Sequence, residues 1–235
     1  MPPTDRLTPT SYALLGQLAL RQWSGYEMTQ NVRRTLHWFW PRAESVLYAE
    51  LRRLRELGYA EVHESPGRRG RPQAVYSITE TGRRELERWL DEAPQGSSLH
   101  SEPVLRVHLA PYGTKPDLVN ALERARDDAE GLLRLAVTIG GEFAEARHQF
   151  QDQVHVRAIL FEYLWSYGLA TYRWATSSLD VIDDWTDLAP TADRLEVGRE
   201  RIEELIRGAP DAITSDPPSV DDPAEPQEHH DRAAS

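Results

Sequence analysis

The sequence predicts a mainly α-helical protein, in which a small helical domain with one β-hairpin precedes a domain of long helices. Two observations lead to this prediction. Apolar residues recur at helical spacing in the first 57 residues and again over residues 118–182, whereas residues 59–78 alternate apolar and polar side chains, as strands do. The chain has 235 residues, of which 40% are hydrophobic, so it is long enough for two globular domains.

The composition excludes several classes of protein. The chain has no cysteine, which excludes disulfides, thiol nucleophiles and cysteine-ligated zinc sites. It has no apolar run of membrane-spanning length, and its first residues, MPPTDRLTPTSY, lack the profile of a secretory signal. We therefore expect a cytoplasmic protein that does not interact with a membrane.

The charge is distributed unevenly along the chain. The formal net charge is −11, which alone would argue against binding to nucleic acid. Residues 1–92, however, hold 14 arginines and 12 acidic residues, a net charge of +2, whereas the remainder holds 13 basic and 26 acidic residues, a net charge of −13. A nucleic-acid-binding domain can therefore precede an acidic one.

Three short helices are expected in the N-terminal domain. The first begins at Thr8-Pro9, a hydroxyl cap followed by a proline, and the second extends from about Ser24 to Leu36. The third opens at Pro41 and ends at Gly58, a helix-terminating residue. The apolar residues that mark the second helix are Tyr26, Met28 and Val32.

A β-hairpin and a fourth helix follow. YAEVHE and QAVYSI alternate as strands do, and SPGRRGRP between them makes a turn with a basic tip. TETGRRELERWL then begins with a threonine cap and continues as an amphipathic helix. This order of helices, hairpin and helix is that of a winged helix-turn-helix domain.

Over residues 6–92 the chain resembles the PadR family of bacterial transcriptional regulators. The segments that resemble it are LTPTSYALLGQLALRQWSGYEMTQNV, SVLYAELRRLRELGYAE and GRPQAVYSITETGRRELERWL. The resemblance implies a DNA-binding winged helix and, for the longer subgroup, a C-terminal helical dimerisation region. It also implies a response to small aromatic or drug-like molecules.

The third helix is the candidate DNA-recognition helix. At 100° per residue, one side carries Ala43, Leu47, Leu51, Leu54 and Leu57. The opposite side carries Ser45, Tyr48, Ala49 and Arg52, with Arg42 at its flank in reach of a phosphate. The alternative is a merely solvated face. We assign Arg68, Arg69 and Arg71 of the hairpin tip to the minor groove or the DNA backbone.

Two residue sets near this helix need separate explanations. Glu50 falls toward the apolar side, where an ion pair with an arginine of a neighbouring helix would accommodate it. The rings of HWFWPRAES look like a binding site, but we interpret Phe39 and Trp40 as a staple that fixes the angle at which the third helix begins. Trp38 is the ring of the three that we most expect to be partly exposed, and its role stays open.

The C-terminal half has the pattern of a pairing domain. Apolar residues follow 4-3 spacing from Leu118 to Phe150, with Gly140-Gly141 as a point where the helix could kink, and again from Val154 to Ile182. Two such seams exceed what the helices can bury on each other, so we expect a homodimer on a pseudo-palindromic operator. The expected dimerisation residues are Leu118, Leu122, Leu132, Ile139, Phe143, Phe161, Trp165, Tyr172 and Leu179.

An effector site is the second expectation for this half. The aromatic residues Trp165, Tyr167, Tyr172 and Trp174 could form a cavity at the dimer interface for a small aromatic or drug-like effector. The alternative is that they are ordinary interface core.

We divide the chain into four segments. They are a winged helix-turn-helix domain (1–92), a linker (93–113) in which VLRVHL could form a short buried segment, a helical dimerisation domain (114–208) and a disordered acidic, proline-rich tail (209–235).

The sequence gives little sign of an enzyme. Glu145-x-x-His148 has the ligand spacing of a di-iron bundle but lacks a second pair, and no phosphate-binding glycine loop is present. We expect no catalytic residues, no metal and no cofactor. The chain is therefore predicted to be a homodimeric transcriptional repressor released by an effector. The alternative is a protein-interaction module that uses the winged helix as a scaffold.

Overall fold

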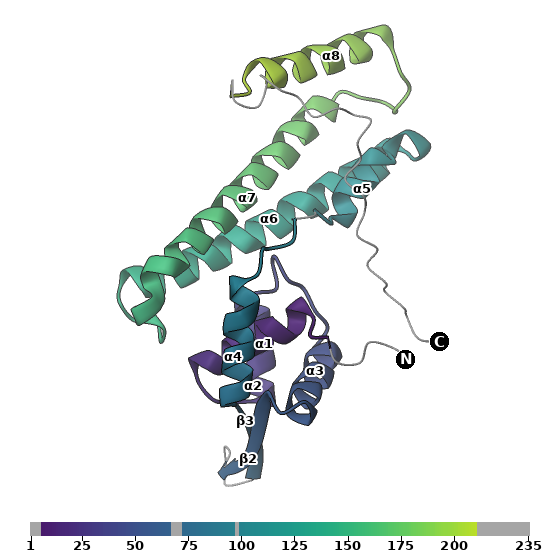
Figure 1. The fold of residues 1–235 in the computed structure, drawn as a ribbon. Coiled ribbons are helices and arrows are strands. Elements are labelled where there is room, and N and C mark those ends of the chain that lie inside the picture. Colours follow the sequence, from purple (N-terminus) through teal and green to yellow (C-terminus); the bar gives the residue numbers. More distant parts are fainter. Residues whose placement is uncertain (1–5, 67–71, 97–98, 211–235) are drawn as a thin grey trace. The chain divides into compact units, whose positions relative to one another are not determined.

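The structure is a computed structural model that describes residues 6–66, 72–96 and 99–210. The chain divides into two compact units, Met1–His100 and Ser101–Ser235, and the division falls within the segment expected as a linker. Figure 1 shows the elements of both units. Among the described residues, no helix has the length and the apolar character needed to cross a membrane.

The first unit has the predicted winged helix-turn-helix order, which confirms the mainly helical fold class. Its helices are α1 (Pro9–Leu20), α2 (Gly25–Thr35), α3 (Glu44–Glu56) and α4 (Glu80–Asp91). Its strands are β1 (Trp23–Ser24), β2 (Ala60–Pro66) and β3 (Pro72–Ile78), which form an antiparallel sheet in the order β1-β3-β2. The sequence did not predict β1, because two residues are too few to show an alternating pattern.

Hydroxyl caps begin the helices where the sequence placed them. Thr8 accepts a hydrogen bond from the Ser11 amide at the start of α1, and Ser24 accepts one from the Glu27 amide at the start of α2. Gly58 ends α3 with φ +77°, a left-handed conformation that costs glycine nothing. The helices pack on a core in which the most deeply buried side chains are Leu14, Leu15, Met28, Leu47, Leu51 and Leu54.

The third helix begins later than predicted. We expected it to open at Pro41, but α3 starts at Glu44, after Ala43 in extended conformation. Trp40 instead closes a turn by donating its backbone amide to the Leu36 carbonyl. The residues between the turn and α3 are therefore free to pack against α1.

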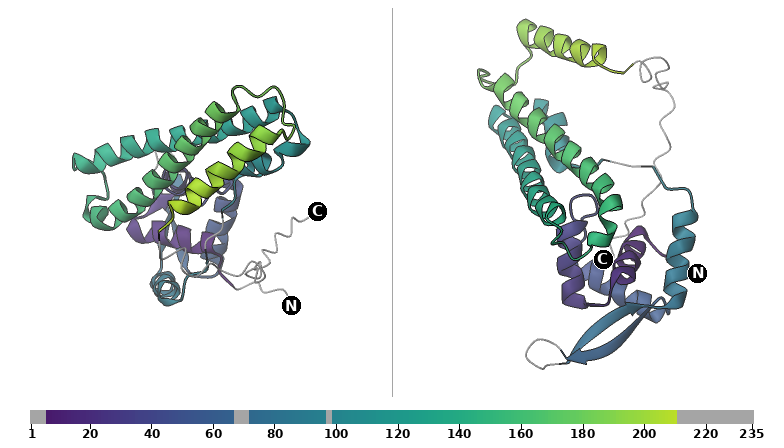
Figure 2. Two further views of the ribbon diagram at one scale, coloured as in Figure 1. Left: turned by 90° about the horizontal axis from the view of Figure 1, so that it is seen from above. Right: turned by 90° about the vertical axis from the view of Figure 1, so that its left-hand side faces the viewer.

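The second unit is built on a pair of long helices. Its elements are α5 (Glu102–His108), the short 3₁₀ turn η2 (Ala110–Tyr112), α6 (Lys115–Ala144), the turn η3 (Gln151–Gln153), α7 (Val154–Ile182) and α8 (Ala192–Arg207). Helices α6 and α7 pack against each other along their length, as both views of Figure 2 show. The segment 93–113, expected as a linker, contains α5, which is capped by Ser101 and packs on α6.

The first seam does not continue through one helix to Phe150 as predicted. Helix α6 ends at Ala144, and Ala146 has a left-handed φ of 53°, which turns the chain toward α7. Gly140-Gly141 does not break the helix. A methyl group at Gly140 would lie 2.9 Å from the Phe161 ring, so this glycine lets α7 approach closely.

Gly82 of α4 provides a test of the packing in the first unit. A Cβ atom at this position would lie 2.1 Å from the backbone carbonyl oxygen of Tyr59, so Gly82→Ala forces the backbone apart. We expect the free energy of unfolding to fall by about 1–3 kcal/mol in denaturant titrations. At Gly16 a methyl group would meet no described atom within 4 Å, and Gly16→Ala should raise the same quantity by about 0.5–1 kcal/mol. Equal free energies of unfolding for the two variants would contradict the close approach of Gly82 to the Tyr59 carbonyl.

Tyr12 joins α1 to α4 and provides a test at alkaline pH. Its ring stacks on Trp89 at 4.5 Å between centroids, and its hydroxyl donates to Oε1 of Glu85 at 2.8 Å. Burial, the hydrogen bond and the negative charge of Glu85 raise the pKa of Tyr12 to about 12.

The unfolded chain releases this phenolic proton near pH 10, before the folded chain does. The contribution of Tyr12 to stability is therefore complete below about pH 10 and is lost as the pH rises to about 12. We expect Tyr12→Phe to make the free energy of unfolding less dependent on pH in this window. The control is Tyr112→Phe, at a position that is 90% exposed, which should follow the unmodified chain.

Candidate nucleic-acid interface

The two faces of α3 differ as the sequence predicted. Leu47, Leu51 and Leu54 are at most 1% exposed and hold the helix on the core. The opposite face is exposed and carries the predicted residues Ser45, Tyr48, Ala49 and Arg52. Hydroxyl and guanidinium groups in the N-terminal half of such a helix are suited to hydrogen bonding with base edges.

The first turn of α1 holds the segment that leads into α3. The hydroxyl of Thr10, a buried side chain, accepts hydrogen bonds from Nε1 of Trp40 at 3.2 Å and from Nε of Arg42 at 3.3 Å. The Arg42 guanidinium also lies over the Trp40 ring, 4.7 Å from its centroid. Arg42 is therefore exposed but held in place at the flank of α3.

Of the three rings in HWFWPRAES, Trp40 has the structural role that we expected. The exposed ring is Phe39, with 39% of its surface accessible, whereas Trp38 is only half-buried and packs edge-on against His37. Trp38 is thus partly exposed, as expected, but Phe39, which we expected to share the staple with Trp40, is more exposed than Trp38.

Glu50 has its partners on α1 and on its own helix. Its Oε1 accepts a hydrogen bond from the Ser11 hydroxyl and another from Nη1 of Arg53, at 2.9 Å. Nη2 of Arg53 in turn donates to the Arg6 carbonyl at 2.9 Å. We had expected the arginine partner of Glu50 on a neighbouring helix, but it lies on α3 itself. The neighbouring helix α1 contributes the Ser11 hydroxyl instead.

Helix α2 contributes exposed residues that the sequence analysis missed. Tyr26, expected on the apolar side, is 68% exposed. At 100° per residue, Tyr26 lies 200° around α2 from the buried Met28. The helical spacing therefore already indicated that Tyr26 is not on the apolar side. Two contacts join α2 to the N-terminal half of α3. Gly25 lies against the Tyr48 ring, and Nη1 of Arg33 lies 3.1 Å from Oε1 of Glu44.

The tip of the wing lies outside the described residues. Arg68, Arg69 and Arg71 fall in the segment 67–71, so their role stays a prediction. The described parts of β2 and β3 pair in antiparallel register from Ala60↔Ile78 to Pro66↔Pro72. This pairing of the two described strands agrees with the predicted hairpin.

The residues expected to form the dimer interface pack largely within one chain. Leu118, Leu122 and Leu132 are buried in a single chain, and Leu132 contacts Gly168 of α7. Ile139, Phe143, Phe161, Tyr172 and Leu179 are half-buried, and Trp165 is exposed. The buried leucines of the first seam therefore pack within their own chain, whereas a role of the other residues in dimerisation stays a prediction.

The four aromatic residues expected around an effector do not share one cavity in the described part of the chain. Trp165 and Tyr172 lie on one side of α7, whereas Tyr167 and Trp174 are about 180–200° away on a helical wheel. Trp165 stacks on Phe161, while Trp174 packs against the apolar cluster of Leu118, Leu122 and Ile182. The predicted cavity lies between two chains, so it stays a prediction.

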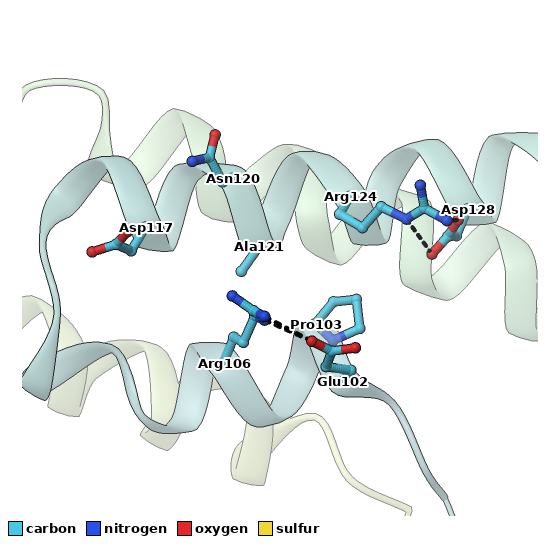
Figure 3. Close-up of a pocket in the computed structure, with 8 residues that line it drawn as sticks. All are labelled: Glu102, Pro103, Arg106, Asp117, Asn120, Ala121, Arg124 and Asp128. Atoms are coloured by element: carbon cyan, nitrogen blue, oxygen red, sulfur yellow. Dashed lines mark hydrogen bonds and ion pairs between the residues drawn. The ribbon is translucent and has the colours of Figure 1, made fainter.

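A pocket of about 500 Å³ lies between α5 and α6, and Figure 3 shows its lining. Its charged groups pair along their own helices, Arg106 with Glu102 and Arg124 with Asp128, each at 2.8 Å. Such a polar, self-paired lining differs from the apolar pockets that hold small organic ligands. Among the described residues, no group of three or more His, Cys, Asp or Glu could hold a metal ion.

Comparison with known proteins matches the first unit to one family. Residues 14–88 match the transcriptional regulator PadR-like family. The negative transcriptional regulator PadR of Bacillus subtilis is 32% identical over 79 residues, which are 34% of this chain and 43% of that protein. The match thus spans less than half the length of this relative.

Solved structures extend the similarity to the fold of the second unit. The structure of Bacillus subtilis PadR in complex with operator DNA has a TM-score of 0.59 at 20% identity, covering 73% of this chain and 98% of that one. The structure of the same protein in complex with p-coumaric acid has a TM-score of 0.53 at 22% identity, covering 74% and 98%. At these identities the structures establish a shared fold, and the sequence match to the PadR-like family of transcriptional regulators covers residues 14–88, which lie in the first unit.

Proposed function

We propose that this chain binds double-stranded operator DNA as a homodimer, represses transcription, and leaves its operator when a small aromatic effector binds. The observation that carries the proposal is the outer face of α3. Ser45, Tyr48, Ala49 and Arg52 are exposed together on a helix whose other face is fixed to the core. Since Bacillus subtilis PadR has been solved with operator DNA, the same fold supports the same kind of partner here.

The charge of the first unit supports a DNA partner. Residues 1–92 carry a net charge of +2 in a chain of net charge −11. Arg42 at the flank of α3 and the arginines of the hairpin tip would contact phosphates, while Arg52 would contact a base edge or a nearby phosphate. Recognition would depend on these non-covalent contacts alone.

A homodimer is supported by the outer side of α7. This side carries an apolar stripe that a single chain leaves 36–70% exposed and that consists of Val156, Ile159, Leu160, Tyr163 and Tyr167. An exposed apolar stripe of this length is characteristic of an interaction surface. A two-fold dimer through α7 would present two copies of α3 to a pseudo-palindromic site.

An effector site between protomers is supported by the same stripe. Bacillus subtilis PadR, a negative regulator by name, has been solved with p-coumaric acid. Tyr167 is part of the exposed stripe, and a second chain would add aromatic surface beside it. We therefore place the effector at the α7 interface, and propose an aromatic molecule because the accessible lining is aromatic and aliphatic.

Selection of DNA from a randomised duplex library by the full chain tests operator binding. We expect a pseudo-palindromic sequence, and we expect Arg52→Ala to weaken binding to it by about 1–3 kcal/mol because a contact to a base is lost. Arg84→Ala is the matched control, because Arg84 is also exposed but lies on α4 beside Glu80. Failure of the chain to enrich any sequence would favour the protein-interaction module.

Addition of p-coumaric acid to the complex of the chain with the selected duplex tests whether an aromatic effector releases the chain from its operator.

Sedimentation of an α7 variant tests the dimer. Ile159 is 70% exposed in a single chain, and Ile159→Glu would place a charge in the middle of the proposed interface. We expect the variant to sediment as a monomer, whereas Tyr112→Glu, a change at an exposed ring outside α7, should leave the dimer intact. A dimer that survives Ile159→Glu would exclude this stripe as the interface.

A further inference from the structure

Helix α8 carries an apolar stripe that is exposed along its length. At 100° per residue, five residues fall within about 100° on one side of the helix: Leu195, Gly198, Ile202, Leu205 and Ile206. The four apolar side chains of this α8 stripe are 51–76% exposed, and no residue of α8 is buried. A helix of 16 residues is only marginally stable in water by itself, so α8 needs a partner for this stripe.

Gly198 indicates that the partner approaches closely. Glycine in the middle of a helix is destabilising relative to alanine. A methyl group at Gly198 would meet no described atom within 4 Å, so no contact within the described chain explains the glycine. In the same unit, Gly140 and Gly168 give room to side chains of the facing helix, Phe161 and Leu132. Gly198 would let a second helix approach the α8 stripe in the same way.

The charges beside the α8 stripe argue against two α8 helices packed on each other. Arg194 and Arg201 lie along one border of the stripe and Arg199 along the other, while the carboxylates of α8 lie farther around the helix. Two such stripes face to face would place arginines beside arginines, and like charges repel each other. The stripe therefore fits an apolar surface whose border carries a carboxylate.

The outer side of α7 offers such a surface. Its exposed apolar stripe, called the α7 stripe from here on, spans residues 156–167 and is as long as the α8 stripe of residues 195–206. Glu162 lies at the border of the α7 stripe near its middle, and Arg201 lies at the border of the α8 stripe near its middle. Both are exposed, and neither has an ion pair among the described residues.

These two charged residues also determine the direction of packing. Glu162 directly precedes Tyr163, and Arg201 directly precedes Ile202, and both apolar residues lie near the middle of their stripes. Each charged side chain therefore lies about 100° to the same side of its stripe when the helix is viewed from its N-terminus. Two facing helices bring equal sides together only when they run antiparallel. An antiparallel arrangement therefore places Arg201 near Glu162.

The α7 stripe of the same chain is out of reach for α8. Arg194, in the first turn of α8, lies over the Trp185 ring at 4.9 Å from its centroid, and Trp185 packs on the apolar cluster that contains Ile182, the last residue of α7. Glu162 lies about 30 Å before Ile182 along α7, whereas Arg201 lies only about 10 Å after Arg194 along α8. The α8 helix of a second copy has no such restriction.

We propose that α8 of each protomer packs antiparallel on the α7 stripe of a second copy, with Arg201 of one chain paired to Glu162 of the other. This inference rests on the proposed homodimer and names what covers its α7 stripe. A two-fold axis perpendicular to α7 makes the two α7 helices antiparallel, which brings the end of one α7, with the α8 that follows it, toward the beginning of the other. The exchange of α8 helices adds two equal apolar contacts to each dimer.

Cysteine cross-linking of the full chain tests the contact directly, because the chain has no cysteine of its own. The double variant Glu162→Cys with Arg201→Cys should form a disulfide between chains on oxidation, seen as a dimer in a non-reducing gel. The matched control combines Glu162→Cys with Arg207→Cys and should stay unlinked, because Arg207 lies on the far side of α8. A disulfide within one chain, or none at all, overturns the inference.

Charge reversal tests the pair in solution. Arg201→Glu places a carboxylate against Glu162 and should raise the dimer dissociation constant, measured by sedimentation over a range of concentrations, about 3- to 30-fold, because two contacts are lost per dimer. Glu162→Arg should do the same, and the variant with both changes should regain most of the affinity. Arg207→Glu is the control and should leave the constant unchanged. A double variant that dimerises no better than the single variants overturns the pairing.

Removal of α8 separates this inference from the proposed dimer. A chain that ends after residue 191 lacks α8, and a chain that ends after residue 210 keeps it. Because no residue of α8 is buried, the other helices should fold without it, as circular dichroism would show. The shorter chain should dimerise at least about 10-fold more weakly than the longer one.

The remaining outcomes are distinct. If both truncated chains dimerise equally well, while Ile159→Glu still gives monomers, the inference is overturned and the dimer through α7 stands. A full chain that is monomeric, or a dimer that survives Ile159→Glu, overturns the inference together with the proposed interface.

Discussion

The buried polar first turn of α1 determines where α3 sits. Ser11 is fully buried, and a buried hydroxyl must find a hydrogen-bond partner. Its partner is Glu50, a carboxylate on the inner edge of α3 that also accepts from Arg53. One residue earlier, Thr10 accepts hydrogen bonds from Trp40 and Arg42, which lead into the same helix. The one turn therefore holds α3 at its beginning and at its middle.

This arrangement explains why a charged residue is tolerated next to the core. Removal of the Ser11 hydroxyl would leave the Glu50 carboxylate with only part of its hydrogen bonds, and an incompletely paired buried charge is costly. The leucines of α3 alone would allow the helix to slide or rotate, because apolar contacts have no direction. The polar contacts have fixed directions, so they set the rotation of α3 and with it which side chains face outward.

Local signals in the sequence were sufficient for most of the first unit. Caps such as Thr8 and Ser24, the left-handed Gly58 and the alternation in the hairpin act within a few residues, and the structure has each of them. The start of α3 and the partners of Glu50 could not be predicted, because both depend on α1, which is 30 to 39 residues away in the sequence. The exposure of Tyr26 was predictable from the helical phase of α2, but its aromatic character suggested burial.

In the second unit, the sequence pattern could not predict which chain supplies the partner of each helix. A 4-3 spacing of apolar residues states that a helix has a partner, but it does not state to which chain the partner belongs. Leu122 and Leu132 are buried within one chain, because the turn at Ala146 brings α7 back along α6. A helix that packs one side on α6 needs no apolar residues on the other, yet Ile159 and Tyr163 stand exposed on that outer side of α7. Helices α6 and α7 therefore carry more apolar surface than they bury on each other, and this excess is the stronger argument for a second chain. It is seen from the exposure of side chains, which the spacing of apolar residues alone cannot provide.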